Sequence, residues 1–392
     1  MKKLIIASAI ALAATGASAQ VKVGVILGFT GPLESITPGM ADSAELAFKE
    51  ASDSGLLLGG QKIEAIRGDS TCTDSAAASA AAERLITSDG VVAIMGADCS
   101  GVTTAIANNV AVPKGVVMVS PSATSPALTT IKDNGYFFRT APSDARQGQV
   151  LADIVKGRGI DEIAVTYTNN DYGKGLSDSF ANAFKAAGGK VAITAAHEDG
   201  KADYSAEVGA LAASGAKVLA VFGYVDQGGK GIIQAALDAG AFDEFVMADG
   251  MVGQSLIDAI GSDLNGSFAT LPGNEGEGSK MYNKLAETAG IGTEGPYRGE
   301  SYDAAALISL AIQAAGSTDR AAIQSKLMSV ANAPGTKILP GELAKGLKIL
   351  ADGGDIDYVG ATSVELTEVG ESGGSYKELE VKDGKFETIK VH

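Results

Sequence analysis

The chain has 392 residues, of which 45% are hydrophobic, so it is long and apolar enough to form two domains with cores of their own. Its 47 acidic residues outnumber its 31 basic residues, and the formal net charge is −16 at pH 7. Such an acidic surface argues against nucleic acids and anionic membranes as binding partners.

The first residues have the pattern of a secretion signal. Lys2 and Lys3 precede an apolar stretch at 4–14, and Ala17, Ser18 and Ala19 provide the small residues of a cleavage site. The stretch is too short for a stable membrane-spanning helix, although an uncleaved anchor is the alternative. We therefore expect residues 1–19 to be a cleaved signal peptide and the mature chain, with a net charge of −18 (−16 minus the two lysines), to reach the periplasm.

Strand-like and helix-like segments alternate at the start of the mature chain. Apolar, β-branched runs predict strands at 21–29, 61–67, 91–96 and 116–120. Helical periodicity or alanine-rich composition predicts helices at 40–52, 75–88 and 102–111. This alternation predicts a doubly wound parallel sheet.

The same alternation starts again near residue 161, after a predicted crossover at 138–144. We expect strands at 161–169, 190–196, 217–223 and 244–248, and helices at 176–187, 205–214 and 229–240. Residues 170–175 and 273–280 are predicted loops, a helix is expected from Glu300 onward, and the tail predicts short strands. The chain therefore contains two α/β units.

Two hydroxyl-rich loops follow predicted strands of the first unit. One is ADCSGVTTA, with Ser100 near its centre, and the other is SPSATSP, which begins at Ser120. Loops at the carboxyl ends of parallel strands form the ligand crevice of such sheets. Hydroxyl and backbone N–H groups there suit a small anion such as a carboxylate.

The chain has two cysteines, Cys72 and Cys99. An even number of cysteines in an exported chain predicts a disulfide between them, the alternative being two buried thiols. Such a bridge would tie the GDSTC segment to the loop that contains Ser100.

Catalysis finds little support in the sequence. The only histidines are His197 and the terminal His392, so an imidazole metal site or a Ser-His-Asp triad is not expected. No phosphate-binding or dinucleotide-binding glycine motif follows a strand. Neighbouring acids, such as those at 161–162 and 243–244, are interpreted as solvated surface rather than as a glycosidase pair. We expect no catalytic residue, cofactor or metal.

A set of motifs in fixed order carries a family resemblance: GFTGP, GDSTC, GADCS, SPSATSPALT, FRTAPSD, NDYGKG and the SYDAAAL helix. Together they resemble the leucine/isoleucine/valine-binding proteins of ABC transporters, in the type I periplasmic binding protein superfamily, over essentially the whole mature chain. The resemblance implies two Rossmann-like α/β lobes with parallel sheets, joined by a three-crossover hinge. We expect residues 20–141 and 271–362 in lobe 1, and residues 142–270 and 363–392 in lobe 2.

The resemblance also assigns roles to residues of the first lobe. Ser100 matches a serine that binds the α-carboxylate of the ligand, with a simple helix cap as the alternative. Ser122, Ala123 and Thr124 match a segment that meets the carboxylate and ammonium, with an ordinary turn as the alternative.

Further ligand contacts are expected from other segments. Tyr172 and Tyr224 match tyrosines of the second lobe, each with core packing as the alternative. Asp249 stands where the family often has a glutamate that pairs with the ammonium; a helix cap is its alternative. Ile36, in a loop that departs from the usual pattern, is expected to shape the side-chain pocket.

The resemblance thus implies a non-catalytic periplasmic receptor that captures a neutral aliphatic amino acid and delivers it to the permease and ATPase subunits of an ABC transporter. The alternative is a ligand sensor of the same fold, coupled to a signalling partner and binding an amino acid, an amide or a related carboxylate. We expect a monomer that binds no nucleic acid.

Overall fold

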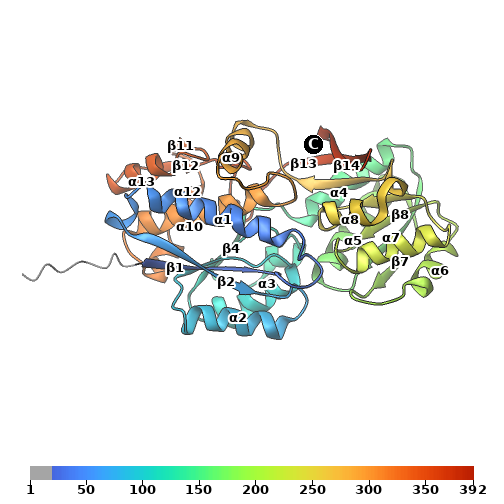
Figure 1. Cartoon of the computed structure of the whole chain (residues 1–392), viewed down its shortest axis with the longest axis horizontal. Coiled ribbons are helices and arrows are strands. Elements are labelled where there is room, and N and C mark those ends of the chain that lie inside the picture. The colour runs from blue at the N-terminus through green and yellow to red at the C-terminus, as the bar shows by residue number, and fades with distance from the viewer. Residues whose placement is uncertain (1–19) are drawn as a thin grey trace, which may run out of the picture.

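The computed structural model describes residues 20–392, and the predicted signal peptide lies outside the described residues. Two α/β bodies lie side by side along the long axis of the molecule (Figure 1). We call the body built on the five-stranded sheet the first lobe, and the body built on the seven-stranded sheet the second lobe. Within residues 20–392, no helix is both long and apolar enough to cross a membrane.

The sheet of the first lobe is entirely parallel, in the order β2-β1-β3-β4-β5. Its central strands are short and fully buried, because helices cover both faces. The strands are β1 (Gln20–Leu27), β2 (Lys62–Asp69), β3 (Ala93–Gly96), β4 (Val117–Ser120) and β5 (Phe137–Arg139).

The helices of the first lobe come from both ends of the chain. Between the strands run α1 (Thr37–Asp53), α2 (Ser75–Thr87) and α3 (Ser100–Ile106). The later part of the chain adds α9 (Glu277–Thr288), α10 (Arg298–Ala315), α11 (Arg320–Gln324), α12 (Leu327–Ala331) and α13 (Leu343–Ala351), with a parallel pair β11 (Thr336–Ile338) and β12 (Ile356–Tyr358). Helix α10 is apolar on nearly all sides, and it is accordingly buried between α1, α13 and the sheet.

The sheet of the second lobe has the order β14-β13-β10-β9-β8-β6-β7. Its parallel part consists of β6 (Glu162–Thr168), β7 (Lys190–His197), β8 (Val218–Phe222), β9 (Glu244–Met247) and β10 (Phe268–Pro272). An antiparallel hairpin, β13 (Tyr376–Lys382) and β14 (Lys385–Val391), extends it at one edge. The helices are α4 (Asp144–Gly157), α5 (Asp171–Ala186), α6 (Ser205–Ala212), α7 (Gly228–Asp238) and α8 (Gln254–Ile260).

The chain passes between the two sheets three times: after β5, after β10 and after β12. The first and third passages lie against each other. The N–H of Arg139 donates to the carbonyl of Gly370 (2.9 Å), and the N–H of Ser372 donates to the carbonyl of Arg139 (3.1 Å). The predicted fold of two α/β lobes joined by three crossovers is therefore confirmed.

Two of the predicted loops are wrong in part. Residues 170–175 are not a loop, because the side chain of Asn170 accepts the N–H of Gly173 (3.0 Å) and caps α5, which begins at Asp171. In the predicted loop 273–280, helix α9 already begins at Glu277. Helix α4, directly after the first crossover, was not predicted.

Candidate functional site

One buried cavity lies where the strand ends of the two lobes meet. Its free volume is ≈ 20 Å³, far below the ~300–1,000 Å³ that small-molecule sites occupy, so the lobes must separate to admit a ligand. Loops after β1, β3 and β4 of the first lobe and after β6, β8 and β9 of the second supply the wall. The lining residues are Leu33, Ile36, Met40, Asp98, Cys99, Ser100, Ser122, Tyr172, Tyr224, Asp249, Gly250 and Tyr297.

The cavity brings together six of the eight residues that the sequence singled out for ligand binding: Ile36, Ser100, Ser122, Tyr172, Tyr224 and Asp249. The other two, Ala123 and Thr124, are fully buried but are not among the lining residues. The structure thus places the predicted residues from both lobes around one space, and their roles toward a ligand stay predictions.

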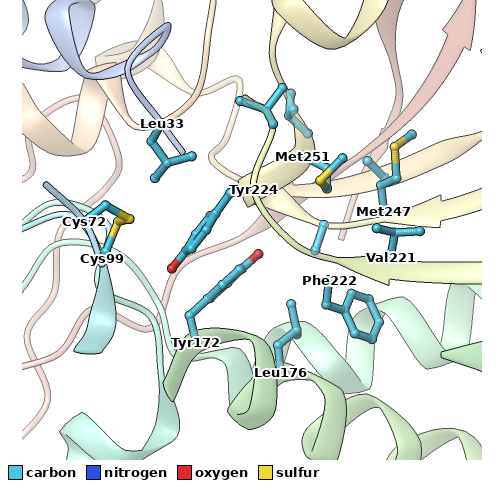
Figure 2. Packing of buried hydrophobic residues seen from close by; sticks show 14 of the residues in the cluster. Leu33, Cys72, Cys99, Tyr172, Leu176, Val221, Phe222, Tyr224, Met247 and Met251 are labelled. Atoms are coloured by element: carbon cyan, nitrogen blue, oxygen red, sulfur yellow. A yellow bond between two sulfur atoms is a disulfide. The ribbon is translucent and has the colours of Figure 1, made fainter. Parts of the chain in front are cut away.

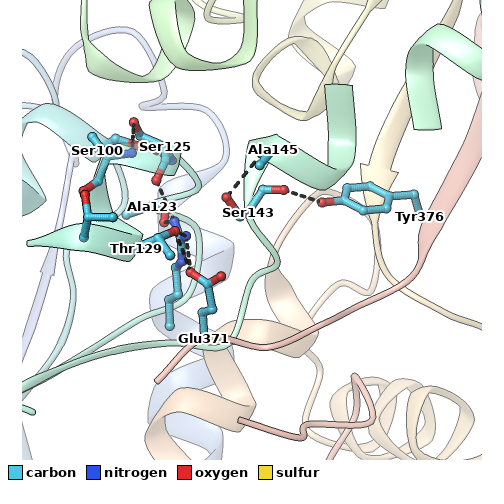
Figure 3. A network of polar contacts seen from close by, with 11 residues as sticks. Ser100, Ala123, Ser125, Thr129, Ser143, Ala145, Glu371 and Tyr376 are labelled. Atoms are coloured by element: carbon cyan, nitrogen blue, oxygen red, sulfur yellow. Dashed lines mark hydrogen bonds and ion pairs between the residues drawn. The ribbon is translucent and has the colours of Figure 1, made fainter. Parts of the chain in front are cut away.

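Ser100 joins the two hydroxyl-rich loops. Its hydroxyl oxygen accepts the N–H of Ser125 (3.1 Å), as Figure 3 shows, and the serine is the first residue of α3. The cap position of this helix is Cys99, one residue earlier, so Ser100 is not its cap residue. Because the hydroxyl is engaged as an acceptor, its own O–H remains to donate to a ligand at the positive end of the helix.

A buried arginine holds the second hydroxyl-rich loop from behind. The guanidinium of Arg139 donates to the carbonyl of Ala123 (3.0 Å) and the carbonyl of Ser125 (2.9 Å). It also bonds Thr129 and forms an ion pair with Glu371 of the third crossover. Its partners Ala123, Ser125, Thr129 and Glu371 lie close together in Figure 3. Because the N–H of Ala123 is bonded to the hydroxyl of Ser120 (2.9 Å), both of its backbone groups have partners. This explains why Ala123 does not line the cavity.

Two tyrosines of the second lobe form one face of the cavity. The rings of Tyr172 and Tyr224 are stacked, with centroids 5.3 Å apart and an interplanar angle of 15°. Figure 2 shows the pair facing Leu33 and the disulfide of the first lobe. An apolar ligand group would therefore lie between an aromatic face and aliphatic side chains.

Asp249 is the charged centre of the second-lobe wall. Its Oδ1 accepts the hydroxyl of Tyr172 (3.2 Å) and its Oδ2 accepts the hydroxyl of Tyr297 (2.7 Å). The carboxylate therefore bonds side chains across the cavity rather than serving mainly as a helix cap. Burial raises the pKa of Asp249, and the residue is only 3% exposed. No lysine or arginine lines the cavity in the described chain.

A second acid lies close to Asp249. Asp144, the first residue of α4, is completely buried, and neither of its carboxylate oxygens has a hydrogen-bond partner in residues 20–392. Burial raises its pKa and the nearby charge of Asp249 raises it further, whereas the hydroxyl of Thr124 and the charge of Arg139 lower it. The hydroxyl of Thr124 is likewise buried without a partner. Unpaired buried acids are costly, so a cationic group would be stabilised here.

The sequence did not single out Asp98, Asp144, Tyr297 or Met40, whereas Leu33 belongs to the loop 33–39 that was expected to shape the side-chain pocket. Asp98 stands next to Cys99, and its carboxylate accepts the N–H of Gly28 (3.0 Å) and the hydroxyl of Ser70 (3.1 Å). Asp98 directly follows a predicted strand, and this position alone could have marked it as a residue of the site. Tyr297 had none, because it lies in an irregular segment far along the chain from Asp249.

The predicted disulfide is confirmed: Cys72 and Cys99 are bonded, with Cα atoms 5.2 Å apart. Cys99 immediately precedes Ser100 and lines the cavity. The bridge therefore fixes the loop after β3 to the loop after β2, beside the first-lobe wall.

Two α/β lobes with a cavity between the carboxyl ends of their parallel strands define the class of two-lobed small-molecule-binding folds. Residues 20–343 match the model of the periplasmic binding protein family, and the chain belongs to this family. The resemblance stated from the ordered motifs is thus confirmed.

Individual relatives agree with this assignment. The chain is 30% identical over 333 residues to the Leu/Ile/Val-binding protein homolog 3 of Brucella melitensis, covering 82% of this chain and 88% of the relative. Its fold is similar to that of a leucine-binding protein from Thermotoga maritima, with a TM-score of 0.79, 24% identity, and coverage of 95% and 98% of the two chains. It is also similar to an ABC-transporter solute-binding protein from R. palustris in complex with 4-hydroxybenzoate, with a TM-score of 0.76, 20% identity, and coverage of 95% and 97%.

Proposed function

We propose that this chain is the substrate-binding protein of an ABC transporter and that it captures a neutral aliphatic amino acid between its two lobes. The observation that carries the proposal is Asp249: a buried carboxylate, held by two tyrosine hydroxyls, in a cavity lined by no basic side chain among residues 20–392. A ligand ammonium would provide the missing positive charge. Asp144, buried nearby without a partner, adds to this preference.

The other residues of the cavity could bind the carboxylate and the side chain of an amino acid. The free O–H of Ser100 and the hydroxyl-rich loop of Ser122 suit its carboxylate, while Leu33, Ile36 and Met40 suit an aliphatic side chain. Thr124, whose hydroxyl lacks a partner, and Ala123 then support the site from directly behind its wall.

The proposal extends to the biological setting. The chain would be exported by cleavage after Ala19, act as a periplasmic monomer without catalysis, and deliver its ligand to permease and ATPase subunits. Its lobes would comprise 20–141 with 271–362, and 142–270 with 363–392. Membership of the periplasmic binding protein family and the relatives' descriptions support this setting.

The test is calorimetric titration with a panel of amino acids and 4-hydroxybenzoate, after the protein has been unfolded and refolded to remove bound ligand. We expect at least one neutral aliphatic amino acid to bind with micromolar or tighter affinity, about −8 kcal/mol. Binding of the benzoate alone, or no binding of any amino acid, would contradict the proposal.

A pair of variants isolates the role of Asp249. Asp249→Asn should weaken amino-acid binding by about 2–4 kcal/mol, because the ammonium loses its charged partner. Asp258→Asn, on the exposed side of α8, removes the same charge from the same lobe and should leave the affinity unchanged. If both variants bind the amino acid equally tightly, the ammonium pairs with an acid other than Asp249.

A further inference from the structure

A second, larger groove lies between the lobes, separate from the ligand cavity. Its volume is ≈ 600 Å³, and it is open to solvent. On the first-lobe side it is lined by Ser35, Ile36 and the segment that includes Glu294 and Arg298, directly before and at the start of α10. We call it the interlobe basic groove. Within residues 20–392, Ile36 is the one residue that lines both spaces, so its side chain separates them.

The second lobe contributes the other wall of the interlobe basic groove. Lys377 of β13 and Lys385 of β14 lie on it, with Leu379 and Phe386 beside them. The hairpin that carries both lysines lies at the edge of the second lobe that faces α9 in Figure 1. Basic side chains from both lobes therefore line the groove.

These cations lack acidic partners. Arg298, Lys377 and Lys385 form no ion pair with any carboxylate of the described chain, although acids outnumber bases by 47 to 31. Glu294 is the only acid on the wall formed by the described residues. Glu300 lies near Lys377, whose charge lowers its pKa, but burial of Glu300 has the larger effect and raises that pKa to about 8.

Arg298 is fixed in place rather than free to turn away. Its guanidinium packs against Gly39 and donates to the carbonyl of Gly292. A guanidinium has five N–H donors, so most of those on Arg298 remain available. Ser35, Gln254 and Ser255 also line the groove. The hydroxyl of Ser255 donates to Asp226 and the amide of Gln254 donates to Asp258, so the anion donors are those of Arg298 and the lysines.

Like charges from two lobes repel each other when the lobes come together, and an anion between them reverses that effect. We propose that the interlobe basic groove is a second ligand site, which takes a small anion with at least two negative charges, of the polyphosphate or polycarboxylate type. The bound anion contacts Arg298 of one lobe and the lysines of the other, and so favours the closed form. The effect on closure rests on the proposed function, whereas the anion site does not.

The anion site is tested with inorganic pyrophosphate and with citrate, each titrated calorimetrically into the refolded, ligand-free protein at constant ionic strength. We expect Lys377→Gln to weaken binding at least fivefold. Lys382→Gln is the matched control, because Lys382 lies on the same strand, is not among the residues that line the groove, and pairs with Glu380 (3.1 Å). It should change binding less than twofold.

Arg298→Gln tests the contribution of the other lobe and should also weaken binding at least fivefold, with its thermal unfolding recorded to verify the fold. Lys385→Gln provides an independent variant if either of the others fails to fold. Binding of pyrophosphate alone assigns the site to phosphate-type anions, and binding of citrate alone assigns it to carboxylates.

Absence of binding by both anions at millimolar concentration, or equal weakening by Lys377→Gln and Lys382→Gln, overturns the proposal. The effect on closure has its own readout, because linkage requires the anion and the amino acid to raise each other's affinity by the same factor. Amino-acid affinity that does not change with saturating anion overturns the bridging role. Failure of every amino acid to bind would contradict the proposed function, but the anion titration would still decide whether the anion site exists.

Discussion

The hydroxyl of Tyr297 donates a hydrogen bond to Oδ2 of Asp249 over 2.7 Å, and the two residues belong to different lobes. Tyr297 directly precedes α10, and Asp249 directly follows β9 and Ala248. The backbone of Tyr297 has φ +59°, in the left-handed region that non-glycine residues rarely adopt. The bond joins the lobes and also orients the acid that we assign to the ligand ammonium.

Tyr297→Phe should therefore weaken binding of the amino acid about 5- to 30-fold, because loss of a hydrogen bond to a buried charged group costs about 1–2 kcal/mol. Calorimetric titration of the refolded variant measures the change. Tyr282→Phe is the matched control, since its buried hydroxyl bonds that of Ser43 (2.7 Å) away from the cavity. A Tyr297→Phe protein that binds as tightly as the Tyr282→Phe protein would show that this bond does not contribute to binding.

Reduction of the Cys72–Cys99 bridge should destabilise the protein by about 2–5 kcal/mol, because the unfolded chain gains the freedom of the loop that the bridge closes. The two cysteines are 27 residues apart in the chain. Urea unfolding with and without a reductant measures the loss, and Cys72→Ala/Cys99→Ala should behave like the reduced protein. Identical urea midpoints for the oxidised and reduced protein would contradict this expectation.

The alternation of strands and helices was predictable because local patterns determine it. Apolar β-branched runs mark buried parallel strands, and glycine-rich turns mark their ends. The start of α5 was missed because capping by Asn170 depends on one side-chain bond, which converts an apparently loop-like segment into the first helical turn.

The candidate site was predictable only where ligand-facing residues follow predicted strands or match the ordered motifs. Tyr297 lies 48 positions from Asp249 and outside any periodic segment, so only the fold brings it there. The sequence also could not predict that Ala123 lies behind the cavity wall. Its position depends on Arg139, whose side chain binds the loop from a neighbouring strand. Contacts of this kind come from tertiary packing rather than from local pattern.

Glu300 should make the stability of the protein decrease between about pH 4.5 and pH 8. Burial raises the pKa of this carboxyl to about 8 from an ordinary value of 4.5. In that interval the folded state holds a proton that the unfolded state has lost, so the free energy of unfolding falls as pH rises. Urea unfolding at pH 5, 7 and 9 measures the slope.

Glu300→Gln removes this titration. The variant should match the natural protein at pH 5 and exceed its stability at pH 9 by roughly 2–5 kcal/mol, because the buried negative charge is absent. Glu287→Gln, at an exposed position on α9, serves as the control and should reproduce the slope of the natural protein. Parallel pH profiles for the natural and Glu300→Gln proteins would assign the slope to other groups.

Asp226 bonds the first lobe through Ser35 and Pro32 and is held within its own lobe by Ser255. Its Oδ1 accepts the hydroxyl of Ser255 (2.7 Å), and its Oδ2 accepts the N–H of Ser35 (2.9 Å) in the loop before α1. The N–H of Asp226 also donates to the carbonyl of Pro32 (3.1 Å). These bonds need no ligand, so they stabilise the closed form once closure has occurred.

Asp226→Ala should therefore release the ligand about 5- to 30-fold faster, because the side-chain bond between the Asp226 carboxylate and the N–H of Ser35 contributes about 1–2 kcal/mol to the closed form. The association rate should stay within about twofold, since the open lobes expose the same residues to the ligand. Stopped-flow measurement of both rates, with Asp258→Ala as the control, separates these effects. A slower association with unchanged dissociation would place the action of Asp226 in ligand entry rather than in holding the lobes closed.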